Sequence, residues 1–349
     1  MDRTKVGLMP RWILAISALA TTACFGQPLA ISLERPAPVG LPVWLKISAS
    51  NPVEGFYPFG LGLPVGFGCN QVEVRRNGQM LSEIANIVDQ SKSSGIMAEV
   101  GNPCGSVLHD LLFGTVRPTH PPRLPLHLRY RFDQPGIYEV RYTENREQFT
   151  LPRGPTVWTA WTPIEIQPGS AEFRASWLAE MSTHAPTDTV EALTDFLPSI
   201  LGIPDPESLR LLGPYLYHPD KLVRRFAGVA LTYWPAVQAE ASVKEWLRTN
   251  GPSDGMINFL ARGPFNALPD FNSILEIALP YLQSDSPVLV AGAVAAAHHL
   301  TGSASKASPE LRKRAEKALM DAQDHIRAVG DSATVSQLDS LLEVLPKLR

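Results

Sequence analysis

Short apolar segments alternating with polar residues dominate the chain from residue 27 to about residue 169. Apolar side chains occupy every second position of 42–48, and the segment 71–75 runs into Asn77-Gly78, a dipeptide that favours a tight hairpin turn. The segment 126–132 places Leu126, Leu128, Tyr130 and Phe132 on one face of an expected strand. Further strands are expected over 29–33, 137–142 and 164–166. Strands at this spacing predict a β-sandwich.

One segment of this region carries a family resemblance. Residues 132–140 contain an Asp-x-x-Gly-x-Tyr pattern that runs from Asp133 to Tyr138. The pattern resembles a late hairpin of immunoglobulin-like domains, in which the tyrosine lies at the start of a strand. The resemblance implies an immunoglobulin-like sandwich over 27–169, and it implies nothing about chemistry.

Helical spacing replaces the alternation after Pro168-Gly169. Phe173, Trp177 and Met181 recur at i, i+4 and i+8, which predicts an amphipathic helix. The clearest unit is a helix over 208–216, a turn, and a second helix over 222–231. Terminal helices are expected over 309–329 and 334–348.

This helical unit recurs 66 residues later in the chain. Pro214-Tyr215-Leu216 matches Pro280-Tyr281-Leu282, and alanines recur in the helix that follows each copy. A period of 66 residues leaves room for two shorter units. A further, degenerate unit is then expected between the two copies, over 253–261. Alanine at these positions allows neighbouring helices to pack closely.

The turn at Asp220, followed by Val223-Arg224, Ala227 and Ala230-Leu231, resembles HEAT-like (armadillo-type) repeats. The second copy departs from the pattern, because Val290 stands at the position of Arg224. The resemblance implies a short α-solenoid over 170–349 whose concave side binds other proteins. The alternative is an irregular helical bundle without a binding role. The expected fold class is therefore multidomain, all-β followed by all-α.

The first 26 residues have the layout of a secretory signal peptide. A basic start precedes an apolar run of about twelve residues, which is shorter than the ~20 that span a bilayer. We expect cleavage after Gly26 and a mature protein without a transmembrane helix. The alternative is cleavage before Cys24, which would make the protein an outer-membrane lipoprotein, although Thr21 departs from the usual lipobox.

Export leaves two cysteines in the mature chain, Cys69 and Cys104. In an oxidising compartment an even pair predicts a disulfide, which is typically worth about 2–4 kcal/mol. The alternative is two separate buried thiols. Secretion or a periplasmic location is therefore the expected localisation.

Composition narrows the function classes. The 349 residues are 44% hydrophobic and 19% charged, which excludes a disordered chain, and the net charge of −3 argues against a nucleic-acid binder. The chain holds 32 prolines, about twice the usual share, and they fall at strand ends and near helix starts.

Few residue patterns in the chain point to catalysis or to metal binding. The adjacent His298 and His299 point about 100° apart on a helix and would not chelate one metal ion. The segment 303–306 fits the Ser-x-x-Lys pattern of serine acylases without its companion motifs. No nucleophile elbow, phosphate-binding loop or dinucleotide motif occurs, so no catalytic residue, cofactor or metal is expected.

Aromatic residues supply the candidate binding surfaces. Phe56, Tyr57 and Phe59 lie in a proline- and glycine-rich segment, and they either contact a partner or fold over the end of the sandwich. Trp158 and Trp161 lie at the end of the predicted sandwich, and they either stack on a sugar or partner or plug the space between the two domains.

We therefore expect an exported, non-catalytic protein-binding or scaffolding protein of the cell envelope, with unidentified protein partners. One alternative is a hydrolase with a site between the domains, built from His109, Asp110 or His127. Another is carbohydrate binding by the sandwich.

Overall fold

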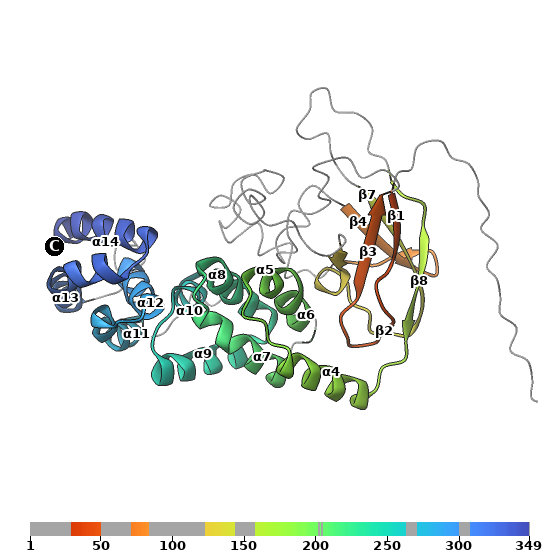
Figure 1. Ribbon diagram of the computed structural model, residues 1–349, viewed down its shortest axis with the longest axis horizontal. Helices are drawn as coiled ribbons and strands as arrows, with labels where there is room; N and C mark the ends of the chain where they lie inside the picture. Colours follow the sequence, from red (N-terminus) through yellow and green to blue (C-terminus); the bar gives the residue numbers. More distant parts are fainter. Residues whose placement is uncertain are drawn as a thin grey trace, which may run out of the picture.

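A computed structural model describes residues 29–49, 71–83, 123–143, 158–201, 203, 205–262, 271–299 and 308–348. Strands gathered into two sheets fill the N-terminal part, and helices fill the part that follows (Figure 1). The chain therefore has mixed β and α content, with the two kinds of element segregated along the sequence.

The first sheet has the strand order β1-β3-β6, and the second has the order β2-β8-β7-β4-β5. Antiparallel pairs join all neighbours except β2 and β8, which run parallel. The strands are β1 (Leu29–Leu33), β2 (Ala37–Pro38), β3 (Trp44–Ala49), β4 (Gln71–Arg76), β5 (Gln79–Met80), β6 (Arg123–Pro125), β7 (Gly136–Thr143) and β8 (Thr162–Gln167).

Alternation places one side of each sheet in a shared core. Leu45 from β3, Val74 from β4 and Val140 from β7 are fully buried there. The predicted hairpin is present, because Asn77 and Gly78 both have positive φ angles, of 50° and 78°. Such angles match the type I′ turn that joins two twisted antiparallel strands.

The expectation of a strand over 126–132 was wrong. The chain pairs with β3 only through β6 and then forms a 3-10 turn over Leu126–Leu128. Leu126 still points into the core of the sheets, but Leu128 joins the core of the helices. Period-two spacing misled here because Leu126, His127 and Leu128 are all buried, so hydrophobicity did not report a single face.

The helical part begins two residues after Gly169. Its α-helices are α4 (Ala171–Thr183), α5 (Thr189–Glu191), α6 (Leu197–Leu201), α7 (Pro206–Leu212), α8 (Lys221–Ala230), α9 (Ala236–Asn250), α10 (Asp254–Arg262), α11 (Phe271–Ala278), α12 (Pro287–His298), α13 (Pro309–Val329) and α14 (Ser332–Val344). A π-helical segment over Ala192–Phe196 joins α5 to α6, and a 3-10 turn over Leu345–Leu348 follows α14.

The repeat read from the sequence has a structural counterpart. The expected helix over 208–216 is divided, because α7 ends at Leu212 and a 3-10 turn, η4 (Gly213–Tyr217), carries Pro214 at its start. The second copy has the same division, with α11 followed by η6 (Leu279–Gln283) and Pro280 in the same place. A proline has no N–H to donate back to the preceding helix, so each turn tightens there.

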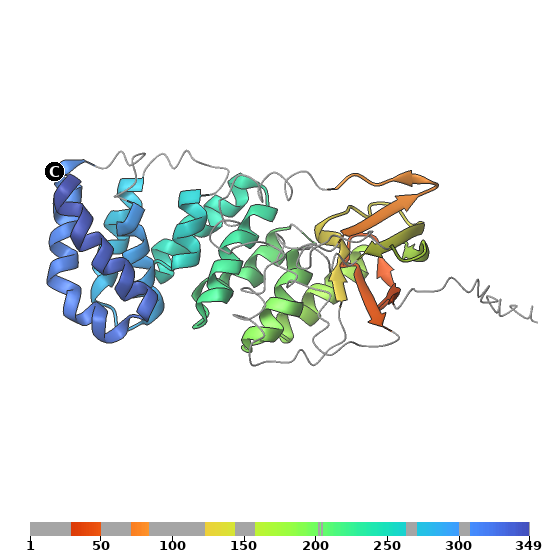
Figure 2. The same ribbon diagram turned by 90° about the horizontal axis from the view of Figure 1, so that it is seen from above.

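Alternate helices of this region, α8, α10 and α12, pack on one another along the length of the helical part (Figure 2). Glycine permits the contact, because a methyl group on Gly255 would meet the backbone oxygen of Arg224. One on Gly292 would lie 2.5 Å from the main chain of Pro252. The sequence pattern had assigned this role to alanines, and Ala227 and Ala293 are indeed fully buried beside these glycines.

Polar contacts tie each unit to the next at a separation of about thirty residues. Tyr217 donates to the carbonyl of Trp246, and Trp234 Nε1 donates to the carbonyl of Asp205. Arg224 Nε donates to Asp254 Oδ1 at 2.5 Å, and both side chains are more than nine-tenths buried. At the position of Arg224 in the second copy, Val290 is fully buried and makes an apolar contact instead.

The sheets and the helices are joined through β3 and the turn after β6. Trp44 Nε1 donates to Ser199 Oγ at 3.2 Å, and His127 Nε2 donates to the carbonyl of Pro198 at 2.8 Å. Trp44 breaks the predicted alternation of β3, because it is buried on the side that the pattern assigned to solvent, where its ring N–H binds Ser199 of α6. Across the described helices, none is long and apolar enough to cross a membrane.

Candidate binding surface on the second sheet

The outward side of the second sheet carries a dense array of aromatic, apolar and charged side chains. Strand register defines it, because Glu73 lies opposite Arg141, Arg75 opposite Glu139, and Met80 opposite Arg75. We call this the outer sheet face. It consists of Glu73, Arg75, Met80, Ile137, Glu139, Arg141, Trp158, Trp161 and Pro163.

Thr159 holds the two tryptophans at the end of β7. Its backbone N–H donates to the carbonyl of Tyr142 at 2.8 Å, and its hydroxyl accepts from the N–H of Tyr142 at 3.0 Å. Thr159 itself is buried. The segment therefore turns Thr159 inward and leaves Trp158 and Trp161 against the outer sheet face.

Arginine and tryptophan side chains stack alternately there. The Arg75 guanidinium lies 4.1 Å from the centroid of the Trp161 ring, and the Arg141 guanidinium lies 4.7 Å from the same centroid. Arg141 also lies 4.5 Å from the centroid of the Trp158 ring. Each contact is a cation–π interaction, worth about 0.5–1 kcal/mol at an exposed site.

Each of these arginines also forms hydrogen bonds with a glutamate on the neighbouring strand. Arg75 forms two hydrogen bonds with Glu139, at 2.7 and 2.9 Å, and Arg141 Nε donates to Glu73 at 2.5 Å. The hydrogen bond with Arg75 lowers the pKa of Glu139, and the same bond raises the pKa of Arg75. The surface is electrically balanced, and its planar groups are held rigidly.

Two large apolar side chains extend this surface into solvent. Ile137 is 55% exposed and Met80 is 52% exposed. Few large hydrophobic side chains in the described ranges are exposed to this degree, and these two share one face of one sheet. Tryptophan and arginine dominate the energetic centres of protein interfaces, and a rigid surface loses little entropy on binding.

The expectation that Trp158 and Trp161 plug the space between the domains was wrong. Trp44 occupies that junction, together with His127 and Leu128. Sugar stacking requires an open ring face, and the Trp161 ring already holds two guanidinium groups. Two guanidinium groups therefore lie against the Trp161 ring, where a sugar ring would have to stack.

His127 does not have the environment of a hydrolytic base. Its Nδ1 accepts from Val43 N at 3.0 Å and its Nε2 donates to Pro198, so the main chain engages both ring nitrogens. Burial lowers its pKa to about 4. The imidazole is neutral at ordinary pH, and it bridges the two parts of the molecule.

Several predicted site residues lie outside the described residues. They are Cys24, Phe56, Tyr57, Phe59, Cys69, Cys104, His109 and Asp110, together with the signal segment 1–26 and the segment 303–306.

The adjacent histidines lie at the end of α12. The ring centroids of His298 and His299 are 6.2 Å apart, and the ring planes meet at 85°. The expected divergence of neighbouring helical side chains accounts for this geometry. No group of three or more potential metal ligands occurs within the ranges that the structure describes.

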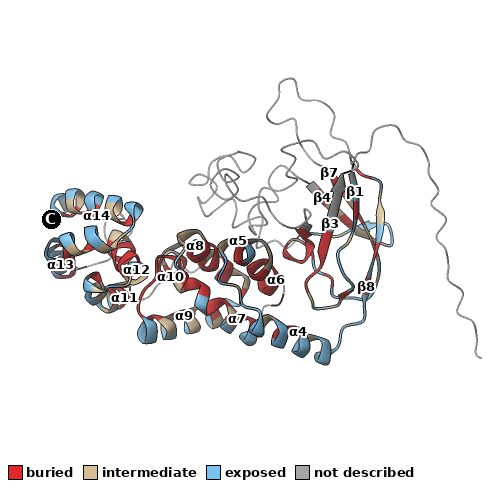
Figure 3. Cartoon of the chain, viewed as in Figure 1, coloured by how far each residue is buried: buried red, intermediate tan, exposed pale blue. Residues whose placement is uncertain are grey.

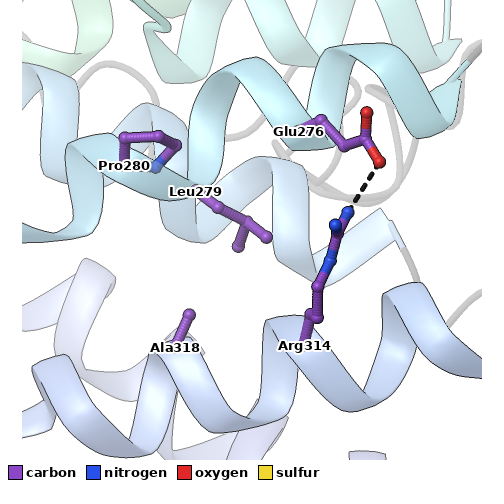
Figure 4. Close-up of a pocket in the computed structure, with 5 residues that line it drawn as sticks. All are labelled: Glu276, Leu279, Pro280, Arg314 and Ala318. Carbon is purple, nitrogen blue, oxygen red and sulfur yellow. Dashed lines mark hydrogen bonds and ion pairs between the residues drawn. The ribbon is translucent and has the colours of Figure 1, made fainter.

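A shallow hollow of about 420 Å³ lies between η6 and α13 (Figure 4). Leu279, Pro280 and Ala318 form its apolar part, and Arg314 donates to Glu276 at 2.6 Å across one end. Both members of this ion pair are more than half exposed. The hollow therefore has no buried polar group that could orient a small ligand.

Sequence reasoning identified the two tryptophans but missed the charged residues beside them. A signal was present, because Glu73-x-Arg75 and Glu139-x-Arg141 repeat the same charge order on two strands. Antiparallel pairing places opposite charges side by side in such a pattern. The pairing of β4 with β7 was the missing information.

No protein-family model matches this chain, and neither curated proteins nor solved structures yielded a significant match.

Proposed function

We propose that this chain is an exported, non-catalytic protein-binding or scaffolding protein of the cell envelope. It would combine an immunoglobulin-like sandwich, stapled by a Cys69–Cys104 disulfide, with a short HEAT-like solenoid. The secretory pattern of residues 1–26 supports the location, and the strand and repeat patterns support the two domain types. The observation that carries the binding role is the outer sheet face, a rigid Trp–Arg stack with Ile137 and Met80 exposed beside it.

The binding element differs from the one that the repeat resemblance implied. Helices α10 and α12 are buried along almost their whole length, so they offer few exposed apolar side chains to a partner. The sandwich supplies a surface with the composition of an interface centre. We therefore assign partner binding to the sandwich, with the helices as its support.

Charge substitutions at the exposed apolar positions test this assignment. We expect Ile137→Lys and Met80→Lys to abolish specific capture of envelope proteins by the full-length mature protein. Met320→Lys on α13 is the matched control, because Met320 is 56% exposed and lies on the helical part. Binding of one purified captured protein, measured by calorimetry, should show the same ranking.

Two outcomes would count against the proposal. Equal losses in all three variants would indicate nonspecific charge effects. Binding to a glycan panel that persists in both sheet variants, without any protein capture, would favour carbohydrate binding.

A further inference from the structure

The outward residues of the second sheet form rows that run across its strands. Strand register places four of them side by side in one row, on β5, β4, β7 and β8 in that order: Met80, Arg75, Glu139 and Pro163. Alternate residues of β8 are exposed, and Pro163 is one of them (Figure 3). The row therefore has an apolar residue at each end and one charge of each sign at its centre.

The neighbouring outward row reverses the order of the charges. Glu73 on β4 lies opposite Arg141 on β7, two residues along the strands from Arg75 and Glu139. Acidic and basic side chains therefore alternate both along each strand and across the strands. We call these four residues the charge quartet. Their side chains are 29% to 34% exposed, so all four can be reached by a partner.

The charge quartet is complementary to a second copy of itself. A two-fold axis that lies in the interface, parallel to the strands, would bring β4 of one copy over β7 of the other. Glu73 then faces Arg141 of the second copy, and Arg75 faces Glu139 of the second copy. The same rotation brings Met80 over Pro163 of the second copy, so apolar residues also meet. Sheets packed face to face keep their strands within about 30° of each other, which preserves this pairing.

The arginines have the hydrogen-bonding capacity for such a contact. Arg75 binds Glu139 through Nε and Nη2, and Arg141 binds Glu73 through the same two atoms. A guanidinium has five N–H donors, so each arginine can bind a second carboxylate while it keeps the first. The rings of Trp158 and Trp161 already order these arginines, so little side-chain entropy is lost on association.

We propose that a second copy of this chain binds the outer sheet face, so that two molecules pair about a two-fold axis. This inference rests on the proposed function, because it names the partner of the same surface. Strand spacing and the length of β7 from Ile137 to Thr143 give a face of about 15 by 20 Å. A standard interface buries about 800 Å² on each partner, so this area predicts a weak dimer with a Kd of about 1–100 μM.

Two variants of the charge quartet test the pairing, with sedimentation velocity of the purified full-length mature protein over micromolar concentrations as the measurement. Arg75→Glu with Arg141→Glu makes the quartet wholly acidic, and Glu73→Arg with Glu139→Arg makes it wholly basic. We expect each variant to self-associate at least tenfold more weakly than the parent, because like charges then face each other. An equimolar mixture of the two should pair at least tenfold more tightly than either variant alone.

The matched control is Arg314→Glu with Arg327→Glu on α13. It changes the net charge as the wholly acidic variant does, and it also breaks two ion pairs. It should self-associate within twofold of the parent and should not pair with the wholly basic variant. Pairing of those two would reveal generic attraction between opposite net charges and would overturn the proposal. Circular dichroism and melting temperature verify that each variant is folded.

Ile137→Lys provides a second test that leaves the charge quartet in place, and it should also weaken self-association. A parent protein that stays monomeric, or a dimer that persists in all of the sheet variants, would overturn the pairing. Capture from envelope extract is a separate measurement. Loss of capture in Ile137→Lys with a monomeric parent would leave the proposed function standing. Unchanged capture in Ile137→Lys, with a dimer that depends on Ile137, would support the pairing and contradict the wider role in capture.

Discussion

Two buried polar side chains, His127 and Arg224, form hydrogen bonds between distant parts of the chain. His127 joins Val43 to Pro198 across the junction of sheets and helices. Arg224 joins α8 to Asp254 at the start of α10, and it also donates to the carbonyls of His218 and Pro219. Both contacts are buried, so removing one partner leaves the other as an unpaired polar group in the interior. That group then destabilises the fold by its desolvation cost.

His127 makes stability depend on pH. Burial lowers its pKa to about 4, against 6.5 in the unfolded chain, so the unfolded state binds more protons between these values. The contribution of neutral His127 to the free energy of unfolding is therefore fully present above pH 6.5. It is lost as the pH drops toward 4, by about 3 kcal/mol in total. Urea unfolding between pH 7 and pH 4.5 measures this slope.

The variant His127→Gln provides the comparison, because glutamine can accept from Val43 and donate to Pro198 but does not titrate in this range. We expect its unfolding free energy to change less between pH 7 and pH 4.5 than that of the parent. Identical slopes for the two proteins would assign the pH dependence to other groups.

The Arg224–Asp254 pair predicts a large cost for removing one charge. Asp254→Asn leaves the Arg224 guanidinium buried without its counter-charge, and we expect a loss of about 3–5 kcal/mol in unfolding free energy. Asp339→Asn breaks the half-exposed pair with Arg327 and should cost less than about 1 kcal/mol. Chemical denaturation of both variants checks the contrast, and similar losses would contradict the account.

Elements pack in this protein through small residues placed where helices touch. The main chains of α8 and α10 meet at Gly228 and Gly255, and α12 meets the start of α10 at Gly292. At these three glycines the helices approach so closely that side chains larger than hydrogen do not fit. The contact between α8 and α10 also includes the buried Arg224–Asp254 hydrogen bond, which spans thirty residues of the chain.

Substituting Gly255 therefore tests how closely helices α8 and α10 pack. Alanine favours helices by about 1 kcal/mol over glycine, but here the added methyl group meets the Arg224 carbonyl oxygen. We expect Gly255→Ala to lower the melting temperature by several degrees. Ser176→Ala on the exposed side of α4 should leave it nearly unchanged, and a stabilised Gly255→Ala variant would refute the close approach.

At the scale of the whole molecule, the sheets and the helices share one boundary. Leu128 leaves the sheet region and packs in the helical core, and Trp44 of β3 bonds to Ser199 of α6. The outer sheet face lies on the second sheet, whereas this junction is formed by the first sheet and the turn after β6. A partner bound to the outer sheet face would therefore leave the junction intact.

The junction contacts between the two cores, made by Trp44, His127 and Leu128, predict cooperative unfolding. We expect a single calorimetric transition for the full-length protein, and two separated transitions for Trp44→Ala, which removes the largest side chain of the junction. Ile137→Ala, on the exposed outer sheet face, is the control and should keep one transition. Two transitions in the parent protein would show that the junction does not couple the parts.

The sequence alone determined most of the elements and their order. Period-two spacing located β3, β4, β7 and β8, helical spacing located α4 and α8, and the 66-residue repeat located two equivalent turns at Pro214 and Pro280. These signals are local, because each arises from the side-chain period of one element or from turn chemistry.

Only the tertiary structure decided which faces meet and which stay open. Nothing near Trp44 in the chain shows that α6 covers it, and nothing near Trp161 shows that Arg75 and Arg141 stack on its ring. The physical reason is separation along the chain: Ser199 lies 155 residues from Trp44, and a contact between distant residues depends on the whole fold. The candidate surfaces therefore came from strand pairing and helix packing, which a single sequence does not encode locally.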